Sequence, residues 1–132
     1  MLLLLACAAP STISVWIEGS EPDLSLTVEA VSLRPEGLDW EADWEWLEPT
    51  GETVELGERG AEGTLSAGRY EHVFVDVGEA SLAGEPLVDV VEPIAAPRRL
   101  RPGSERTLVV TLLVHPDETG ATALFAVDTR WQ

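Results

Sequence analysis

The sequence has no lysine, no asparagine and a single cysteine, Cys7, and its only histidines are His72 and His115. With one cysteine the domain has no internal disulfide, so its stability has to come from a packed core. The absence of lysine excludes a P-loop, whose lysine reaches the phosphates of a nucleotide. Neither histidine begins a recognisable zinc-ligand spacing, so we expect no zinc site and no cofactor.

Positive charge is also scarce, since 24 acidic residues face 8 arginines and the formal net charge is -16. A protein has to neutralise phosphates to bind nucleic acid, so we expect no DNA or RNA partner. The charge is uneven: residues 1–92 hold 20 acidic residues and 3 arginines, whereas residues 93–132 hold 4 and 5. The acidity is therefore partly regional, and its simplest interpretation is a solvated, self-repelling face.

The amino terminus is an apolar run, MLLLLACAAPST, in which residues 4–7 (LLAC) resemble a bacterial lipobox. In that motif the cysteine thiol receives a lipid and becomes the first residue of the mature protein, so Cys7 would carry the anchor. Residues 1–6 would then be the remnant of a signal peptide that begins upstream, and residues 7–20 a lipid-anchored segment with a candidate first strand. The alternative is a misassigned start codon and a chance cysteine.

No other stretch approaches the ~20 apolar residues of a membrane span. We therefore expect an extracytoplasmic protein that is tethered to a bacterial or archaeal membrane, not threaded through it. The length of 132 residues and the apolar content of 45% predict one domain with a packed core, over residues 21–132, and argue against a disordered acidic tail.

Several short apolar runs have a period of two and are separated by turn residues, which predicts β-strands. One of them changes phase near Ala30, which predicts a β-bulge there. Nine prolines and eleven glycines leave no room for a long helix, so the pattern predicts an all-β sandwich or barrel. The runs are TISVWI (12–17), LSLTVEAVSLR (24–34), RYEHVFVDV (69–77), TLVVTLLV (107–114), which is apolar on both faces like a central strand, and TALFAVDTRW (122–131).

Three further segments are assigned from their turn residues. EPTG (48–51) predicts a hairpin between WEWL and TVEL, because Pro and Gly suit a tight turn. GERGAEG (57–63) lacks the spacing of a dinucleotide fingerprint and is interpreted as a flexible loop. The four prolines of segment 83–104 predict edge strands and extended connections.

The order of these strands resembles an uncharacterised family of bacterial and archaeal lipid-anchored domains, over roughly residues 25–128. The resemblance rests on LTVEAVSLRPEG, WEWLEPTGETVEL, LSAGRYEHVFVDV and ERTLVVTLLV, and residues 65–70 (LSAGRY) are its most specific piece. It implies an Ig-like or transthyretin-like antiparallel β-sandwich at the outside of a cell, and it carries over no catalytic residue.

Residues 39–46 alternate strictly between carboxylates and mostly aromatic residues, which predicts a strand with one acidic face and one aromatic face. A helix is the competing interpretation. As a strand, its tryptophans either pack inward, which we expect in a domain of this size, or form an exposed platform for a sugar ring or a partner protein. The candidate ligand-binding residues are Trp40, Trp44, Trp46, Asp43 and Glu45.

Asp39, Glu41 and Asp43 have the first spacings of an EF-hand, but Trp44 and Thr50 stand where that loop needs glycine and glutamate. A looser calcium site built from several loops stays open. No nucleophile elbow or zinc-protease helix is present, so we expect a protein that is not an enzyme.

Two functions follow from these patterns. The first is a structural or interaction lipoprotein of the cell surface or periplasm, with its tryptophans mostly in the core. The second is a module that binds carbohydrate, or a partner in a calcium-dependent way, through the tryptophan-rich acidic segment.

Overall fold

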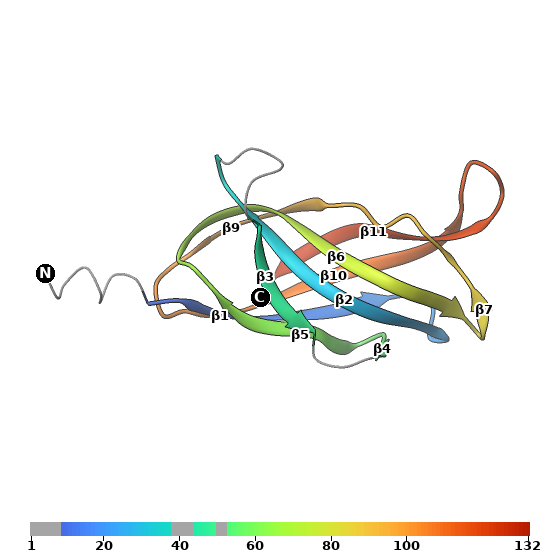
Figure 1. The fold of residues 1–132 in the computed structure, drawn as a ribbon, viewed down its shortest axis with the longest axis horizontal. Coiled ribbons are helices and arrows are strands. Elements are labelled where there is room, and N and C mark those ends of the chain that lie inside the picture. Colours follow the sequence, from blue (N-terminus) through green and yellow to red (C-terminus); the bar gives the residue numbers. More distant parts are fainter. Residues whose placement is uncertain (1–8, 38–43, 50–52) are drawn as a thin grey trace, which may run out of the picture.

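The computed structural model describes residues 9–37, 44–49 and 53–132, and this part of the chain is all-β, as predicted. No helix in these ranges is long and apolar enough to cross a membrane. The strands are β1 (Ser11–Gly19), β2 (Leu24–Pro35), β3 (Glu45–Pro49), β4 (Val54–Glu55), β5 (Glu58–Leu65), β6 (Gly68–Leu82), β7 (Glu85–Pro86), β8 (Val88–Asp89), β9 (Ile94–Leu100), β10 (Glu105–Pro116) and β11 (Thr122–Trp131) (Figure 1).

The strands form one mixed sheet in the order β7-β6-β2-β3-β5-β1-β10-β11-β8, with β4 paired to β2 and β9 paired to β6. Most pairs are antiparallel, but β1 runs parallel to β10 and β11 runs parallel to β8. The predicted antiparallel sheet is therefore wrong in this respect. The physical reason is that β1 lies between β5 and β10, and these two strands run in opposite directions.

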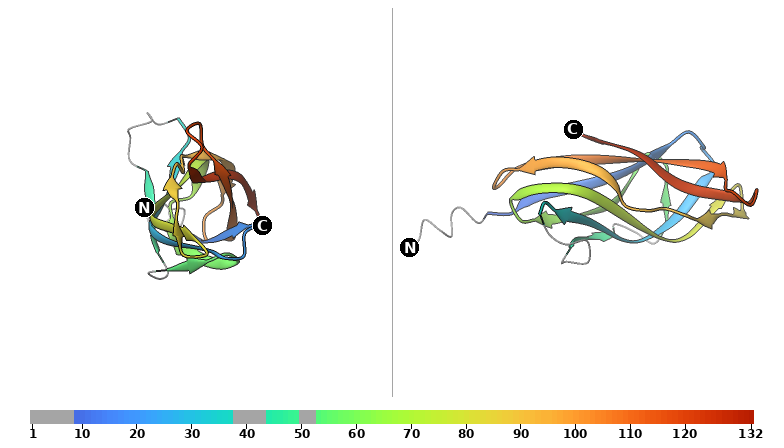
Figure 2. Two further views of the ribbon diagram at one scale, coloured as in Figure 1. Left: turned by 90° about the vertical axis from the view of Figure 1, so that its right-hand side faces the viewer. Right: turned by 90° about the horizontal axis from the view of Figure 1, so that it is seen from above.

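The sheet curls into a nearly closed barrel and is not clearly the two-sheet sandwich that was predicted. Seen end-on, the strands surround a common interior (Figure 2, left). Between β9 and β11, side chains bond to backbone: the Thr129 hydroxyl donates to the Ala95 carbonyl at 2.6 Å, and the Trp131 indole N–H donates to the Ala96 carbonyl at 3.2 Å. Side chains therefore help to join the two ends of the curled sheet.

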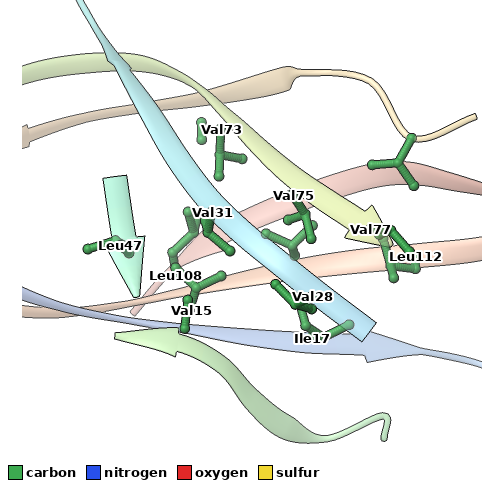
Figure 3. Packing of buried hydrophobic residues seen from close by; sticks show 14 of the residues in the cluster. Val15, Ile17, Val28, Val31, Leu47, Val73, Val75, Val77, Leu108 and Leu112 are labelled. Carbon is green, nitrogen blue, oxygen red and sulfur yellow. The ribbon is translucent and has the colours of Figure 1, made fainter. Parts of the chain in front are cut away.

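The interior is filled by aliphatic side chains from every second position of the long strands, as the period-two runs predicted. Side chains of β2 and β6 face those of β1 and β10 across the barrel (Figure 3). β10, predicted to be central, lies between β1 and β11. The fully buried residues include Ile13, Val15, Ile17, Leu26, Val31, Leu33, Tyr70, Val73, Leu108, Val110, Leu112 and Leu124.

The phase change in β2 is a bulge, as predicted. The register between β2 and β6 shifts on both sides of Val28, between Leu26 and Val28 and again between Val28 and Ala30. Because of the shifts, Val28 and Val31 are both buried although they are three positions apart.

The predicted hairpin between WEWL and TVEL is wrong. β3 pairs with β2 and β5, and β4 pairs with another part of β2, so the described residues show no ladder between β3 and β4. Both short strands run antiparallel to β2, one after the other. Local turn residues could not reveal this, because β2 is long enough to pair with both.

The segment interpreted as a flexible loop, residues 57–63, is mostly strand β5, so that interpretation is also wrong. β5 pairs with β1, and Gly60 lies over the core residue Ile17. A Cβ at position 60 would lie 2.9 Å from the Ile17 Cγ1, so a glycine is needed here for close approach and not for flexibility.

The proline-rich segment 83–104 forms edge strands, as predicted. β7 and β8 lie at the two ends of the strand order, and β9 pairs only with β6. The candidate first strand is β1, which lies well inside the sheet, between β5 and β10.

Candidate functional site

The strand β3 turns a tryptophan outward. Leu47 is buried in the core with 2% of its surface exposed, whereas its neighbour Trp46 is 62% exposed. Successive residues of a strand point to opposite faces, so Trp46 lies on the outer face of the barrel and Leu47 on the inner face. The expected burial of the aromatic face is therefore wrong for Trp46, because the inward positions of this strand belong to Glu45 and Leu47.

The described core is filled by side chains other than tryptophan. Its largest fully buried side chain is Tyr70, and the others of that set are isoleucine, leucine and valine. Trp44 and Trp16 are half-buried, and the guanidinium of Arg59 lies 5.7 Å from the centre of a Trp16 ring. Among the described tryptophans, only Trp46 belongs to the exposed large hydrophobic residues.

An aromatic row crosses the outer face at Trp46. Ser32 of β2 is opposite Trp46 of β3 on one side and opposite Phe74 of β6 on the other. Its neighbours Val31 and Leu33 point inward, so Ser32 points outward, yet only 2% of its surface is exposed. Trp46 and Phe74 therefore flank Ser32 on the outer face.

Glu45 holds the inner side of β3 to Tyr70 and Ser66. Its Oε1 accepts a hydrogen bond from the Ser66 backbone N–H at 2.9 Å, and its Oε2 accepts one from the hydroxyl of Tyr70. The Tyr70 hydroxyl also lies 2.7 Å from the Ser66 carbonyl. Burial, and then the adjacent Glu45 carboxylate, raise the pKa of the Tyr70 phenol above its usual range. Glu45, a candidate ligand-binding residue, thus has both carboxylate oxygens engaged within the protein.

The Tyr70 contact has the form of a tyrosine corner. Tyr70 lies near the start of β6, and its hydroxyl reaches the backbone carbonyl four residues upstream, at Ser66. This arrangement occurs where a strand of a β-sandwich crosses from one sheet to the other. The LSAGRY pattern drew attention to this segment but did not predict the contact of Tyr70.

The other candidate residues are placed as follows. Trp44 is two positions before Trp46 and therefore on the same side of the chain by alternation. Trp40, Asp43 and the lipidation candidate Cys7 lie outside the described residues. In the described ranges no group of three metal-ligating side chains is present.

Three further exposed apolar side chains were not anticipated from the sequence. Val88, Leu113 and Val127 are 44%, 38% and 50% exposed and belong to the neighbouring strands β8, β10 and β11. The ladder pairs Asp128 with Thr111 and Ala126 with Leu112, which leaves Val127 as the extra residue of a bulge. The bulge in β11 depends on how this strand pairs with β10, which the β11 sequence alone does not show, so the sequence pattern missed it.

No family model matches the chain, and no curated protein matches it significantly. The resemblance to lipid-anchored domains therefore stays a prediction. Among solved structures, the chain is similar to a candidate cell adhesion protein of Bacteroides fragilis, with 14% sequence identity and a TM-score of 0.38. The match covers 96% of this chain and 45% of that one, so the chain spans less than half the length of that protein. A likeness this distant establishes neither a family nor a function.

Proposed function

We propose that this protein is a non-enzymatic extracytoplasmic lipoprotein whose β-domain binds a partner through the outer face of β3. The observation that carries the proposal is the 62% exposure of Trp46 on a strand that is otherwise well anchored. Tryptophan is strongly enriched among the residues that dominate binding energy at protein interfaces. Its place beside Phe74, across Ser32, makes an aromatic surface larger than one ring.

The strand below Trp46 is held from three directions, which favours binding. Leu47 packs in the core, Glu45 bonds to Tyr70 and Ser66, and the backbone pairs with β2 and β5. A side chain presented on a rigid strand loses less conformational entropy when a partner binds.

The lipid anchor on Cys7 is the second part of the proposal. It is supported by the lipobox-like residues 4–7 and by the position of Cys7, four residues before the first strand. Cells that express the gene together with the coding sequence upstream of Met1 are grown with a labelled fatty acid, and we expect label in the membrane-bound protein and none in Cys7→Ser. Equal labelling of the two chains would contradict the anchor.

The Ig-like or transthyretin-like origin of the fold is also part of the proposal. It is supported by the tyrosine corner at Tyr70, whose hydroxyl bonds to Ser66 in the turn between β5 and β6.

A second candidate function is carbohydrate binding, with or without calcium, by Trp40, Trp44 and Trp46 and the carboxylates Asp43 and Glu45. The exposed indole of Trp46 favours it, because a flat aromatic ring can stack on the apolar face of a sugar. Calcium has less support, since the oxygens of Glu45 are already engaged.

One experiment tests both candidates. The full chain, produced without acylation and labelled on the thiol of its single cysteine, is applied to arrays of glycans and of extracellular proteins, with calcium and with a chelator. For any ligand found, Trp46→Ala should weaken binding more than about tenfold, the loss typical of a residue at the centre of an interface. Val127→Ala, which truncates an exposed apolar side chain on β11, is the matched control and should change binding less than twofold, about the size expected for a peripheral residue. Equal effects of the two changes would refute a binding role of the β3 face.

A further inference from the structure

Among the described residues, the two ends of the barrel differ in charge. One end is formed by the start of β1, the β5–β6 turn and the β9–β10 turn, and the other by the β1–β2, β6–β7 and β10–β11 turns (Figure 1). The first end holds five of the eight arginines, and we call it the arginine end; they are Arg69, Arg98, Arg99, Arg101 and Arg106. The charged residues in and beside the turns of the far end are all carboxylates: Glu21, Asp23, Glu85, Asp117 and Glu118.

Among the described residues, pairing with carboxylates does not account for all of the arginines at this end. Arg69 of β6 and Arg99 of β9 are directly opposite each other in the ladder, and both are exposed. Like charges in that position destabilise a sheet. Arg69 forms an ion pair with Glu36 at 3.1 Å. The described carboxylates at this end are Glu36, Glu45, Glu71 and Glu105. Glu71 pairs with Arg34 at 2.8 Å, so three carboxylates are left for the five arginines.

The amino-terminal side of the chain leaves from the same end. Ser11, the first residue of β1, is fully buried, and its hydroxyl donates to the Arg101 carbonyl at 2.7 Å. The Thr12 backbone N–H donates to the Ser104 carbonyl at 2.8 Å, so the strand start is fixed to the β9–β10 turn. Cys7 is four residues before Ser11 and can therefore be no more than about 14 Å away from it.

We propose that the arginine end docks on the anionic headgroups of the membrane that carries the protein, so that the barrel stands with its acidic end outward. This inference rests on the proposed lipid anchor, which would hold the arginines within reach of the headgroups. The net charge of -16 does not prevent this docking, because the distant carboxylates are screened by salt. The 15 residues of β6 span roughly 50 Å, whereas charges more than about 8 Å apart in physiological salt solution hardly act on each other.

The test measures co-sedimentation of the full chain, without acylation, with two kinds of vesicle. One is phosphatidylcholine alone, and the other has about one part of phosphatidylglycerol to two of phosphatidylcholine, which gives an anionic surface. We expect stronger binding to the anionic vesicles and loss of the difference at high salt, because the attraction is screened. Equal binding to the two kinds of vesicle would overturn the proposal.

A pair of double variants separates local charge from net charge. Arg99→Gln with Arg101→Gln removes two exposed charges from the arginine end and leaves the Arg101 carbonyl in place for Ser11. We expect the anionic-vesicle partition to fall more than about tenfold, since each arginine near such a surface contributes a factor of about five. The control is Arg59→Gln with Arg130→Gln, which changes the net charge equally but on the side of the barrel, and should have an effect below about twofold if only nearby charges count.

Equal losses in the two double variants would show a net-charge effect and overturn the docking surface. Because the vesicle assay uses the chain without a lipid, its outcome is independent of the fatty-acid labelling of Cys7. An unlabelled Cys7 together with selective binding to anionic vesicles would refute only the anchor.

Discussion

Tyr70 and Glu45 link β6 to β3 through a hydrogen bond between the buried phenol and the half-buried carboxylate. The bond lies directly behind Trp46, on the inner side of the strand that presents this ring. The inner side of β3 thus contacts the tyrosine corner, and its outer side is the proposed binding face.

Tyr70→Phe should lower the free energy of unfolding by about 1.5–3 kcal/mol, the usual value for a hydrogen bond to a charged group. The change removes the donor to Glu45 and to the Ser66 carbonyl but keeps the ring in the core. Urea unfolding measures the loss. Glu48→Gln, at an exposed position of the same strand, is the control and should have almost no effect. A loss below about 0.5 kcal/mol in Tyr70→Phe would show that the hydroxyl does not hold β3.

The same phenol predicts an alkaline limit of stability. Burial and the Glu45 carboxylate raise the pKa of Tyr70 in the folded state above the value of about 10 in the unfolded chain. The corresponding stability is fully present below pH about 10 and is lost as the pH rises from there toward the folded pKa. Tyr70 is the only tyrosine and there is no lysine, so few other groups titrate in this window.

An absorbance titration of tyrosinate, together with unfolding followed by circular dichroism, checks this prediction. We expect the phenol to ionise only as the protein unfolds, and the stability of Tyr70→Phe to lack this decline above pH about 10. Ionisation near pH 10 in a protein that stays folded would contradict the buried contact.

Gly60→Ala should cost about 1–3 kcal/mol, the range for overpacking a well-packed core. The added Cβ would lie 2.9 Å from the Cγ1 of Ile17, whose side chain is fully buried and cannot move away. The same change in an Ile17→Ala background should be almost neutral, because the space is then free. Thermal unfolding of the four chains of this cycle measures the coupling, and additive losses would contradict the close approach.

Much of the fold was predictable from local sequence. Period two in the runs that form β1 and β6 gave their buried faces, and the phase change near Ala30 gave a real bulge. Pairing partners were less predictable, because they depend on residues far apart. The parallel pair of β1 and β10 joins strands about 90 positions apart, and the glycines of β5 looked like a loop although they allow close packing on Ile17.

For the candidate site, the sequence predicted the alternation of β3 but not which side faces the core. Glu45 and Trp46 are equally consistent with either side in a period-two pattern. The choice depends on a contact 25 positions away, since Tyr70 supplies the buried donor that lets the Glu45 carboxylate lie inward. Burial of tryptophan was expected from the size of the domain, but aliphatic residues and Tyr70 fill the core.

Trp46 and Leu47 are neighbours in sequence and should differ sharply when each is replaced by alanine. Leu47→Ala removes a side chain that is 2% exposed and should cost about 2–5 kcal/mol, because it leaves a cavity in the core. Trp46→Ala removes a ring that is mostly in water and should cost less than about 1 kcal/mol. Urea unfolding of the two variants gives the comparison, and acrylamide quenching of Trp46→Phe, with Trp16→Phe as the control, reports the exposure of the ring directly. Quenching should fall more in Trp46→Phe than in Trp16→Phe, because the neutral quencher reaches an exposed indole. A large stability loss in Trp46→Ala, together with unchanged quenching in Trp46→Phe, would contradict this prediction. It would mean that the ring packs against the domain and offers no surface to a partner.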